Sequence, residues 1–106
     1  MERRFWNEDL ETLTLAALRK LENERLQAQL DYVWATSLFY SARFAEAGVS
    51  RSALRDLADL PLLPFTEKDE LRQDQQAYPP FGSYLATTPE QVIRVHKTSG
   101  TTGRAL

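Results

Sequence analysis

The feature that most limits the fold is a long stretch, residues 15–35, that contains neither proline nor glycine. Its apolar residues recur three or four positions apart and its charged residues fall mostly between them, which is typical of an amphipathic helix. The apolar face holds Leu15, Leu18, Leu26, Leu30 and Val33, with Ala28 beside it. Thr14, just before the stretch, is a suitable N-cap residue. The sequence therefore predicts one long helix with a face to bury.

Shorter helices are expected to follow, so that residues 10–76 are largely helical. A break at Thr36-Ser37 precedes a second helix over residues 38–47, which Gly48 ends as a C-terminal cap. Ser52 is expected to cap a short helix that includes Leu54 and Leu57. Two prolines make residues 60–65 a stiff apolar connector. Thr66 then caps a last helix, which has acidic residues in its first turn and fades near Gln75.

A single strand is expected near the end of the chain. Residues 78–82 predict a loop, and Thr88-Pro89-Glu90 predicts a turn or a single helical turn. Residues 92–96 are short and rich in β-branched side chains, which favours a strand. The predicted fold class is therefore an α-rich α/β fold, in which N-terminal helices precede a short strand and a Gly/Thr loop within residues 91–104.

The composition allows one small domain and argues against several functions. The 106 residues have a formal net charge of −2, and both signs are mixed along the chain, so no nucleic-acid partner is expected. The absence of cysteine removes disulfides, zinc–cysteine sites and cysteine nucleophiles. The charged N-terminus has no signal-peptide pattern, and no apolar run approaches the roughly 20 residues that span a bilayer. The expected location is the cytoplasm, without membrane association.

One cluster near the C-terminus carries chemistry. Its residues are Thr98, Ser99, Gly100, Thr101, Thr102 and Gly103. Two glycines allow successive N–H groups to turn inward as an anion nest, and the hydroxyls add further hydrogen-bond donors. Lys97 and Arg104 flank the loop with positive charge. The cluster suits a polyphosphate, although a solvated turn rich in Ser, Thr and Gly has a similar composition.

Two common phosphate motifs do not fit this cluster. The two glycines are too close for a Walker loop, and no Lys-Ser/Thr pair follows the second one. A dinucleotide fingerprint needs a third glycine within a βαβ unit. Elsewhere, His96 is expected to pack or to form a hydrogen bond rather than to act as a base, and Trp6 and Trp34 are expected to anchor packing. Asp69, Glu70 and Asp74 are expected to form a solvated helix face, so the sequence predicts no metal ligand and no catalytic side chain.

The cluster resembles the Ser/Thr-Ser-Gly-Thr-Thr-Gly signature of adenylate-forming enzymes, and the preceding chain resembles their phenylacetate–CoA ligase branch. The resemblance covers about residues 5–103. Its motifs are Trp6 before Leu10-Glu11-Thr12-Leu13, Phe39-Tyr40, Phe44-Ala45-Glu46-Ala47-Gly48-Val49, Leu60-Pro61, Pro64-Phe65-Thr66-Glu67-Lys68, Tyr78-Pro79, Phe81-Gly82 and Arg94-Val95-His96. Two departures stand out: Arg104-Ala105 replaces the family's Lys-Pro, and Leu38 stands where proline is common.

The resemblance implies that residues 1–106 are the incomplete N-terminal part of an AMP-binding domain. Such enzymes use ATP and Mg²⁺ to join a carboxylic acid to AMP, and coenzyme A then displaces the AMP. Residues 98–103, with Arg104, would bind the ATP phosphates and stabilise the leaving pyrophosphate. The adenine, acyl and catalytic-lysine sites of the family lie outside residues 1–106, so this chain alone is expected to be inactive.

Three functions remain open from the sequence. The first is ligation of a carboxylic acid, aryl or arylacetic, to coenzyme A, with a homodimer as a further expectation from the resemblance. The second is transfer from the adenylate to another acceptor in a related synthetase. The third is a small helical interaction module without nucleotide chemistry. The sequence names neither the acid nor the acceptor.

Overall fold

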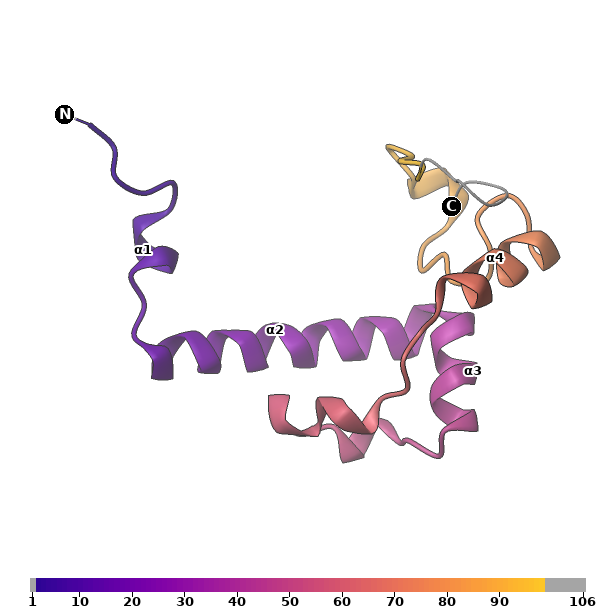
Figure 1. Ribbon diagram of the computed structural model, residues 1–106, viewed down its shortest axis with the longest axis horizontal. Helices are drawn as coiled ribbons and strands as arrows, with labels where there is room; N and C mark the ends of the chain where they lie inside the picture. The colour runs from indigo at the N-terminus through magenta and orange to yellow at the C-terminus, as the bar shows by residue number, and fades with distance from the viewer. Residues whose placement is uncertain (1, 99–106) are drawn as a thin grey trace.

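The computed structural model describes residues 2–98, and the chain is organised along one long helix, α2 (Figure 1). The elements within these residues are α1 (Glu8–Glu11), α2 (Leu15–Thr36), α3 (Leu38–Glu46), η1 (Arg51–Ala53), η2 (Leu57–Leu62), α4 (Lys68–Ala77) and η3 (Pro89–Gln91), where η marks a 3-10 helix. The chain turns from the end of α2 into α3, and η1 and η2 then run back beneath α2. α4 lies near the junction of α2 and α3, on the other side of α2 from η1 and η2.

The first two predicted helices are confirmed, together with their ends. The Thr14 side chain caps α2 by accepting a hydrogen bond from the Ala17 N–H at 3.2 Å. Ser37 separates α2 from α3, because its N–H donates to the Val33 carbonyl and its Oγ accepts from the Tyr40 N–H. Gly48 follows α3 with a φ of 72°, the left-handed conformation that ends many helices.

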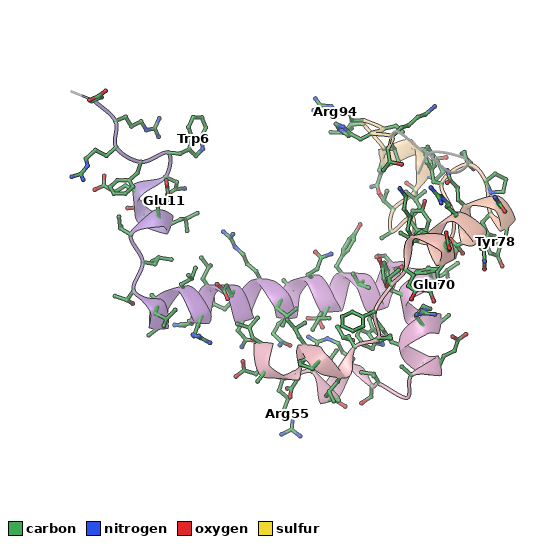
Figure 2. All side chains as sticks on the ribbon, viewed as in Figure 1. Trp6, Glu11, Arg55, Glu70, Tyr78 and Arg94 are labelled. Carbon is green, nitrogen blue, oxygen red and sulfur yellow. The ribbon has the colours of Figure 1, made fainter. Side chains whose placement is uncertain are left out.

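The core lies where α2, α3 and η1 meet. Its buried apolar residues are Leu30, Phe39, Phe44 and Leu54. The rings of Trp34 and Phe44 are tilted against each other with centroids 4.6 Å apart, so Trp34 anchors packing as predicted. Trp6 does not: it is 84% exposed, and it lies on the N-terminal arm, where the Arg3 guanidinium is 5.3 Å from its ring (Figure 2).

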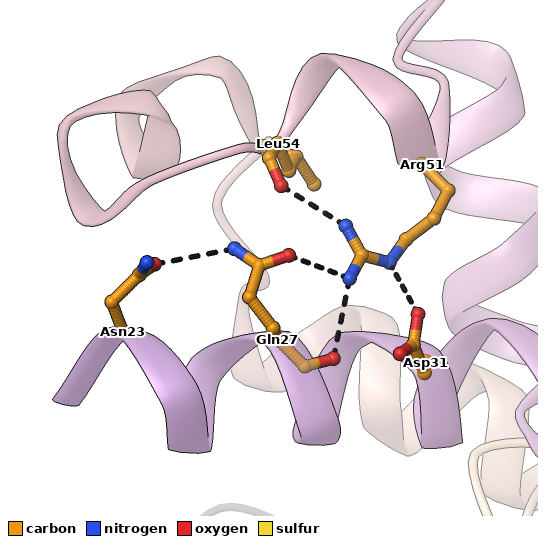
Figure 3. Close-up of polar contacts among 5 residues, drawn as sticks. All are labelled: Asn23, Gln27, Asp31, Arg51 and Leu54. Carbon is orange, nitrogen blue, oxygen red and sulfur yellow. Dashed lines mark hydrogen bonds and ion pairs between the residues drawn. The ribbon is translucent and has the colours of Figure 1, made fainter. Parts of the chain in front are cut away.

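Arg51 fastens η1 to the middle of α2 (Figure 3). Its guanidinium donates to the side chain of Asp31 at 2.8 Å, to the side-chain oxygen of Gln27 at 2.7 Å and to the backbone carbonyls of Gln27 and Leu54. Gln27 in turn donates to Asn23 at 3.3 Å. The planar fork of the guanidinium lets one side chain join two elements.

Three predicted caps and connectors differ from the structure. Ser52 lies inside η1 and caps no helix, and η2 begins after Asp56, where the Asp59 carboxylate accepts from the Arg55 and Asp56 N–H groups. The first half of the 60–65 connector belongs to η2, which contains Pro61. α4 begins after Glu67 rather than Thr66, because Glu70 accepts from the Glu67 N–H at 2.9 Å.

The predicted strand over residues 92–96 is wrong for the structure described: Val92 has an extended backbone, but residues 92–96 pair with no other described segment, and residues 2–98 contain no strand. A strand exists only through hydrogen bonds to a neighbour, so β-branched composition alone does not make one. Ile93 is 98% exposed. In the part of the chain that the structure describes, the α/β fold class therefore reduces to an all-helical arrangement.

The molecule is less compact than an independent domain of its length. Its Cα radius of gyration is 17.5 Å, whereas a compact domain of this size has about 13 Å. Several large apolar side chains lie on the surface, among them Phe65 at 95% and Leu38 at 77% exposure. None of the helices among residues 2–98 is both long and apolar enough to cross a membrane.

Candidate phosphate-binding site

Thr98 is the one predicted phosphate-binding residue within the described part of the chain, and its side chain is exposed. Ser99, Gly100, Thr101, Thr102, Gly103 and Arg104 lie outside the described residues, so their role in phosphate binding stays a prediction. What the structure does describe is the approach to the loop and the surface beside it.

The approach begins at η3 (Pro89–Gln91), where the sequence predicted a turn or a single helical turn at Thr88-Pro89-Glu90. Its last hydrogen bond joins the Val92 N–H to the Pro89 carbonyl at 3.2 Å, and the Thr87 hydroxyl donates to the Gln91 side chain at 2.8 Å. Val92, directly after η3, has an extended backbone. η3 therefore turns the chain from the 78–87 segment toward Lys97 and Thr98.

An open cavity of about 710 Å³ lies beside Lys97. One wall is formed by residues of the 79–86 segment, and the other by Val95, His96 and Lys97, with Gln75 of α4 also contributing. His96 is exposed, so of the two roles expected for it, packing and hydrogen bonding, the structure described contradicts packing. The cavity combines apolar walls with a cationic side chain next to the predicted loop.

The 79–86 wall is held by three side chains from the helices. Asp74 accepts hydrogen bonds from both the N–H and the hydroxyl of Ser83. Gln75 donates to the Pro80 carbonyl at 3.0 Å, and the Tyr32 hydroxyl of α2 donates to the Ala86 carbonyl. The Phe39 N–H also donates to the Ser83 carbonyl at 3.3 Å. The loop predicted at residues 78–82 is thus a fixed segment supported by α2, α3 and α4.

Gly82 allows this close approach. Its φ is 80°, and a Cβ atom built there would lie 2.6 Å from Tyr84 Cε1 and 2.7 Å from Asp74 Oδ2. Both distances are too short for a real side chain. The glycine is therefore required by its conformation and by the neighbouring carboxylate together.

Tyr84 links the wall to the core. Its ring meets that of Phe39 edge to face with centroids 6.1 Å apart. Burial raises the pKa of the Tyr84 hydroxyl above its ordinary value of 10.0, and the negative charge of Asp74 and the neighbouring Tyr40 raise it further. Tyr84 therefore stays neutral at physiological pH, and its ring contributes an apolar surface to the wall.

The acidic residues of α4 are more engaged than a solvated face would be. Glu70 forms an ion pair with Arg43 of α3 at 2.5 Å, and Asp74 binds Ser83. Asp69, which is 80% exposed, matches the expectation and lies 3.6 Å from Arg72. Within residues 2–98, no three His, Cys, Asp or Glu side chains come close enough to hold a metal ion. Sequence reasoning missed the Asp74–Ser83 contact, for which the only local signal is the glycine that follows Pro-Pro-Phe.

The sequence is similar to phenylacetate–CoA ligases of several bacteria. It is 43% identical to the one from Thermus thermophilus over 100 residues, which are 94% of this chain, and 39% identical to the one from Pseudomonas putida over 95 residues. The chain spans about a fifth of the length of these relatives. No family model matches the sequence.

The structure is similar to solved 2-hydroxyisobutyryl-CoA ligase. One such structure, in complex with 2-HIB-AMP and CoA in the thioesterification state, superposes with a TM-score of 0.88 at 38% identity, covering 97% of this chain and 22% of that one. Another, in the postadenylation state with 2-HIB-AMP, superposes with a TM-score of 0.86 at 36% identity. This open helical arrangement thus recurs within much longer ligases.

Fold and sequence together place the chain in the class of adenylate-forming CoA ligases. Within that class it belongs, as a segment, to the family of phenylacetate–CoA ligases.

Proposed function

We propose that this chain supplies the phosphate-binding loop of an AMP-forming acid–CoA ligase. The observation that carries the proposal is the match, over nearly the whole chain, to ligases whose solved complexes hold an acyl-adenylate and coenzyme A. The loop sequence of residues 98–103 supplies the chemistry, since N–H groups and hydroxyls around a nucleotide's phosphates stabilise anionic oxygens.

In the proposed reaction a carboxylate attacks the α-phosphate of ATP. The acid oxygen forms a bond to phosphorus while the bond to the bridging oxygen breaks, so that pyrophosphate leaves and an acyl-adenylate remains. The thiol of coenzyme A then attacks the acyl carbon, loses its proton and expels AMP. Residues 98–103 and the cation of Arg104 act in the first step, where negative charge accumulates on the leaving pyrophosphate.

Mg²⁺ is an expected companion of ATP in this reaction. Among residues 2–98 no three potential ligands converge, so these residues do not provide a metal site of their own. A magnesium ion coordinated by nucleotide phosphates needs few protein ligands, because it usually retains several of its waters. The proposal therefore assigns the described residues no part in holding the metal.

The proposed substrate is an aryl or arylacetic acid such as phenylacetate. Four relatives at 36–43% identity carry phenylacetate in their names, which supports an aromatic acid. 2-Hydroxyisobutyryl-CoA ligase, named for a small aliphatic acid, is similar at 38% identity over this segment. Because the segment is shared by ligases of both kinds, the choice of acid has to be measured.

The test uses the complete ligase, meaning this segment joined to the remaining four-fifths of a phenylacetate–CoA ligase. Phenylacetate, benzoate and 2-hydroxyisobutyrate are compared for acid-dependent exchange of pyrophosphate into ATP, and for thioester formation with coenzyme A. We expect both reactions with phenylacetate. Exchange without a thioester would instead favour the synthetase that passes its adenylate to another acceptor.

The role of the loop is tested in the same protein. Gly100→Val fills the nest and Thr101→Ala removes a hydroxyl, and each should lower adenylation by about 100- to 1,000-fold, the usual effect of losing one such donor. Thr66→Ala, at an exposed threonine before α4, is the matched control and should have no effect. Normal adenylation by both loop variants would rule out the assignment of residues 98–103.

A further inference from the structure

From the contacts around α4 we infer that Asp74 is a positioning residue for adenylation. By binding Ser83 it fixes the 79–86 segment, of which Tyr84, Leu85 and Ala86 line the cavity beside Lys97, and so supports the surface next to the proposed phosphate loop. The inference rests on the proposed function, because it concerns the step in which that loop acts.

The contact between Asp74 and Ser83 is suited to fixing a backbone. Each carboxylate oxygen of Asp74 accepts one hydrogen bond, from the N–H and from the hydroxyl of the same residue. A bidentate contact to an ionised acceptor is stronger than a neutral one, and it restrains rotation as well as distance. Asp74 also lies 2.7 Å from the position that a Cβ of Gly82 would take, so the carboxylate is in close contact with the loop backbone.

The Asp74–Ser83 contact lies next to the cavity beside the predicted loop. Ser83 precedes Tyr84, and Tyr84 lines the same cavity as His96 and Lys97. On the other side, Asp74 belongs to α4, which is joined to α3 by the ion pair between Glu70 and Arg43. Asp74 thus joins α4 to the middle of the wall by two hydrogen bonds to one residue, Ser83.

Gln75 and Tyr32 also bind the 79–86 wall, but each donates a single hydrogen bond to a backbone carbonyl. If Asp74 lost its carboxylate, these contacts would still hold the ends of the wall at Pro80 and Ala86. The middle of the wall would then be joined to the helices by the weaker contacts with Phe39, a 3.3 Å backbone hydrogen bond to the Ser83 carbonyl and the ring contact of Tyr84, and could shift. A shift of about 1 Å in a group that positions a reacting centre costs on the order of 100-fold in rate. The effect should therefore appear in catalysis without loss of the fold.

The experiment compares Asp74→Ala with Asp69→Ala in the complete ligase. Both substitutions exchange an aspartate of α4 for alanine, which favours helix, but Asp69 is 80% exposed and touches no part of the wall. The two half-reactions are measured separately: pyrophosphate exchange reports adenylation, and thioester formation from added acyl-adenylate reports the second step. Thermal unfolding of each variant monitors the fold.

We expect Asp74→Ala to lower pyrophosphate exchange by about 10- to 100-fold while thioester formation changes less than about twofold. Asp74→Asn should recover most of the activity, since an amide accepts from the Ser83 N–H through its oxygen and donates to the hydroxyl through its nitrogen. Ser83→Ala, a milder change that keeps the N–H contact, should give a smaller loss in the same half-reaction. Asp69→Ala should match the parent ligase.

The possible outcomes separate this inference from the proposed function. Equal loss in both half-reactions, or undiminished exchange in Asp74→Ala and Ser83→Ala, would overturn the positioning role while leaving the ligase intact. If Asp74→Ala unfolds, Ser83→Ala decides between the same two results. A parent ligase that exchanges no pyrophosphate with any acid would overturn the proposed function, and the inference with it.

Discussion

Gly82 has a positive φ, and its Cα faces Asp74 and Tyr84 at close range. Gly82→Ala should therefore disturb the wall through both backbone strain and overlap. Gly48→Ala is a matched control, because Gly48 has a similar φ of 72° but no neighbour within 4 Å of the position that a Cβ atom would take. Strain alone costs about 1–2 kcal/mol.

We expect amide hydrogen exchange in residues 78–86 of the complete ligase to accelerate at least about tenfold in Gly82→Ala, which corresponds to about 1.4 kcal/mol. Gly48→Ala should change exchange only near the end of α3. Equal exchange in residues 78–86 of the two variants would show that overlap of the added Cβ atom with Asp74 and Tyr84 does not destabilise this segment.

Tyr84 gives the wall a predictable dependence on pH. Its pKa is raised in the folded chain, first by burial and then by Asp74, so the unfolded chain releases this proton at a lower pH than the folded one. The contribution of Tyr84 is therefore fully present below pH 10.0 and is lost as pH rises through the higher folded pKa. Tyr84→Phe should remove this component of the alkaline loss of stability. Tyrosinate absorbance and thermal unfolding are measured for Tyr84→Phe and the parent protein as the pH rises above 10.0. Identical pH dependence of stability in the two proteins would contradict this role of Tyr84.

At the scale of elements, the helices were predictable because their signals are local. The long helix, the Thr14 cap and the Gly48 end each depend on neighbours along the chain, and all three are confirmed. The predicted apolar face of this helix is only partly buried: Leu30 is buried, whereas Leu15 and Leu18 are exposed. The strand over residues 92–96 and the cap at Ser52 depended on partners that a local pattern does not specify. The Asp74–Ser83 contact is likewise tertiary, and Pro79, Pro80 and Gly82 indicated a loop without indicating what holds it.

The junction between η1 and α2 allows a test of which contacts stabilise an element. Arg51→Ala removes all the hydrogen bonds of a side chain that is 26% exposed, and should cost about 1–3 kcal/mol. Asp31→Asn weakens only the ion pair, whose acidic partner is 71% exposed, and should cost about 0.2–1 kcal/mol. The carbonyl contacts of Arg51 should therefore matter more than its ion pair.

Hydrogen exchange of residues 27–36 and 51–62 in the complete ligase measures this difference. Arg55→Ala is the control, because Arg55 belongs to the same region but its side chain points away from α2 (Figure 2). It should stay within about 0.5 kcal/mol of the parent. If Asp31→Asn and Arg51→Ala had equal effects, the ion pair would be the main connection instead.

At the scale of the whole molecule, the open shape and the exposed apolar side chains have one physical consequence. A radius of gyration of 17.5 Å leaves apolar side chains such as Phe65, Leu38 and Ile93 in water. Burial of a side chain of this kind contributes roughly 1.5–3 kcal/mol. The isolated chain should therefore self-associate and bind an apolar dye, and the complete ligase should do so far less. Sedimentation of both at equal concentration measures this, and a monodisperse isolated chain without dye binding would contradict it.

The isolated chain should also fail to make an acyl-adenylate. A phosphate nest stabilises a transition state only when its donors are held by rigid neighbours on both sides. In the described residues, the wall beside Lys97 is supported by α2, α3 and α4, yet the cavity that it faces is open, and residues 92–96 pair with no other segment. Because the chain spans about a fifth of its relatives, most of the surface that closes around a nucleotide in a ligase of their length must come from elsewhere. Acid-dependent pyrophosphate exchange should thus be undetectable with residues 1–106 and present with the complete ligase under the same conditions. Turnover by the isolated chain would mean that these helices and the loop suffice for adenylation.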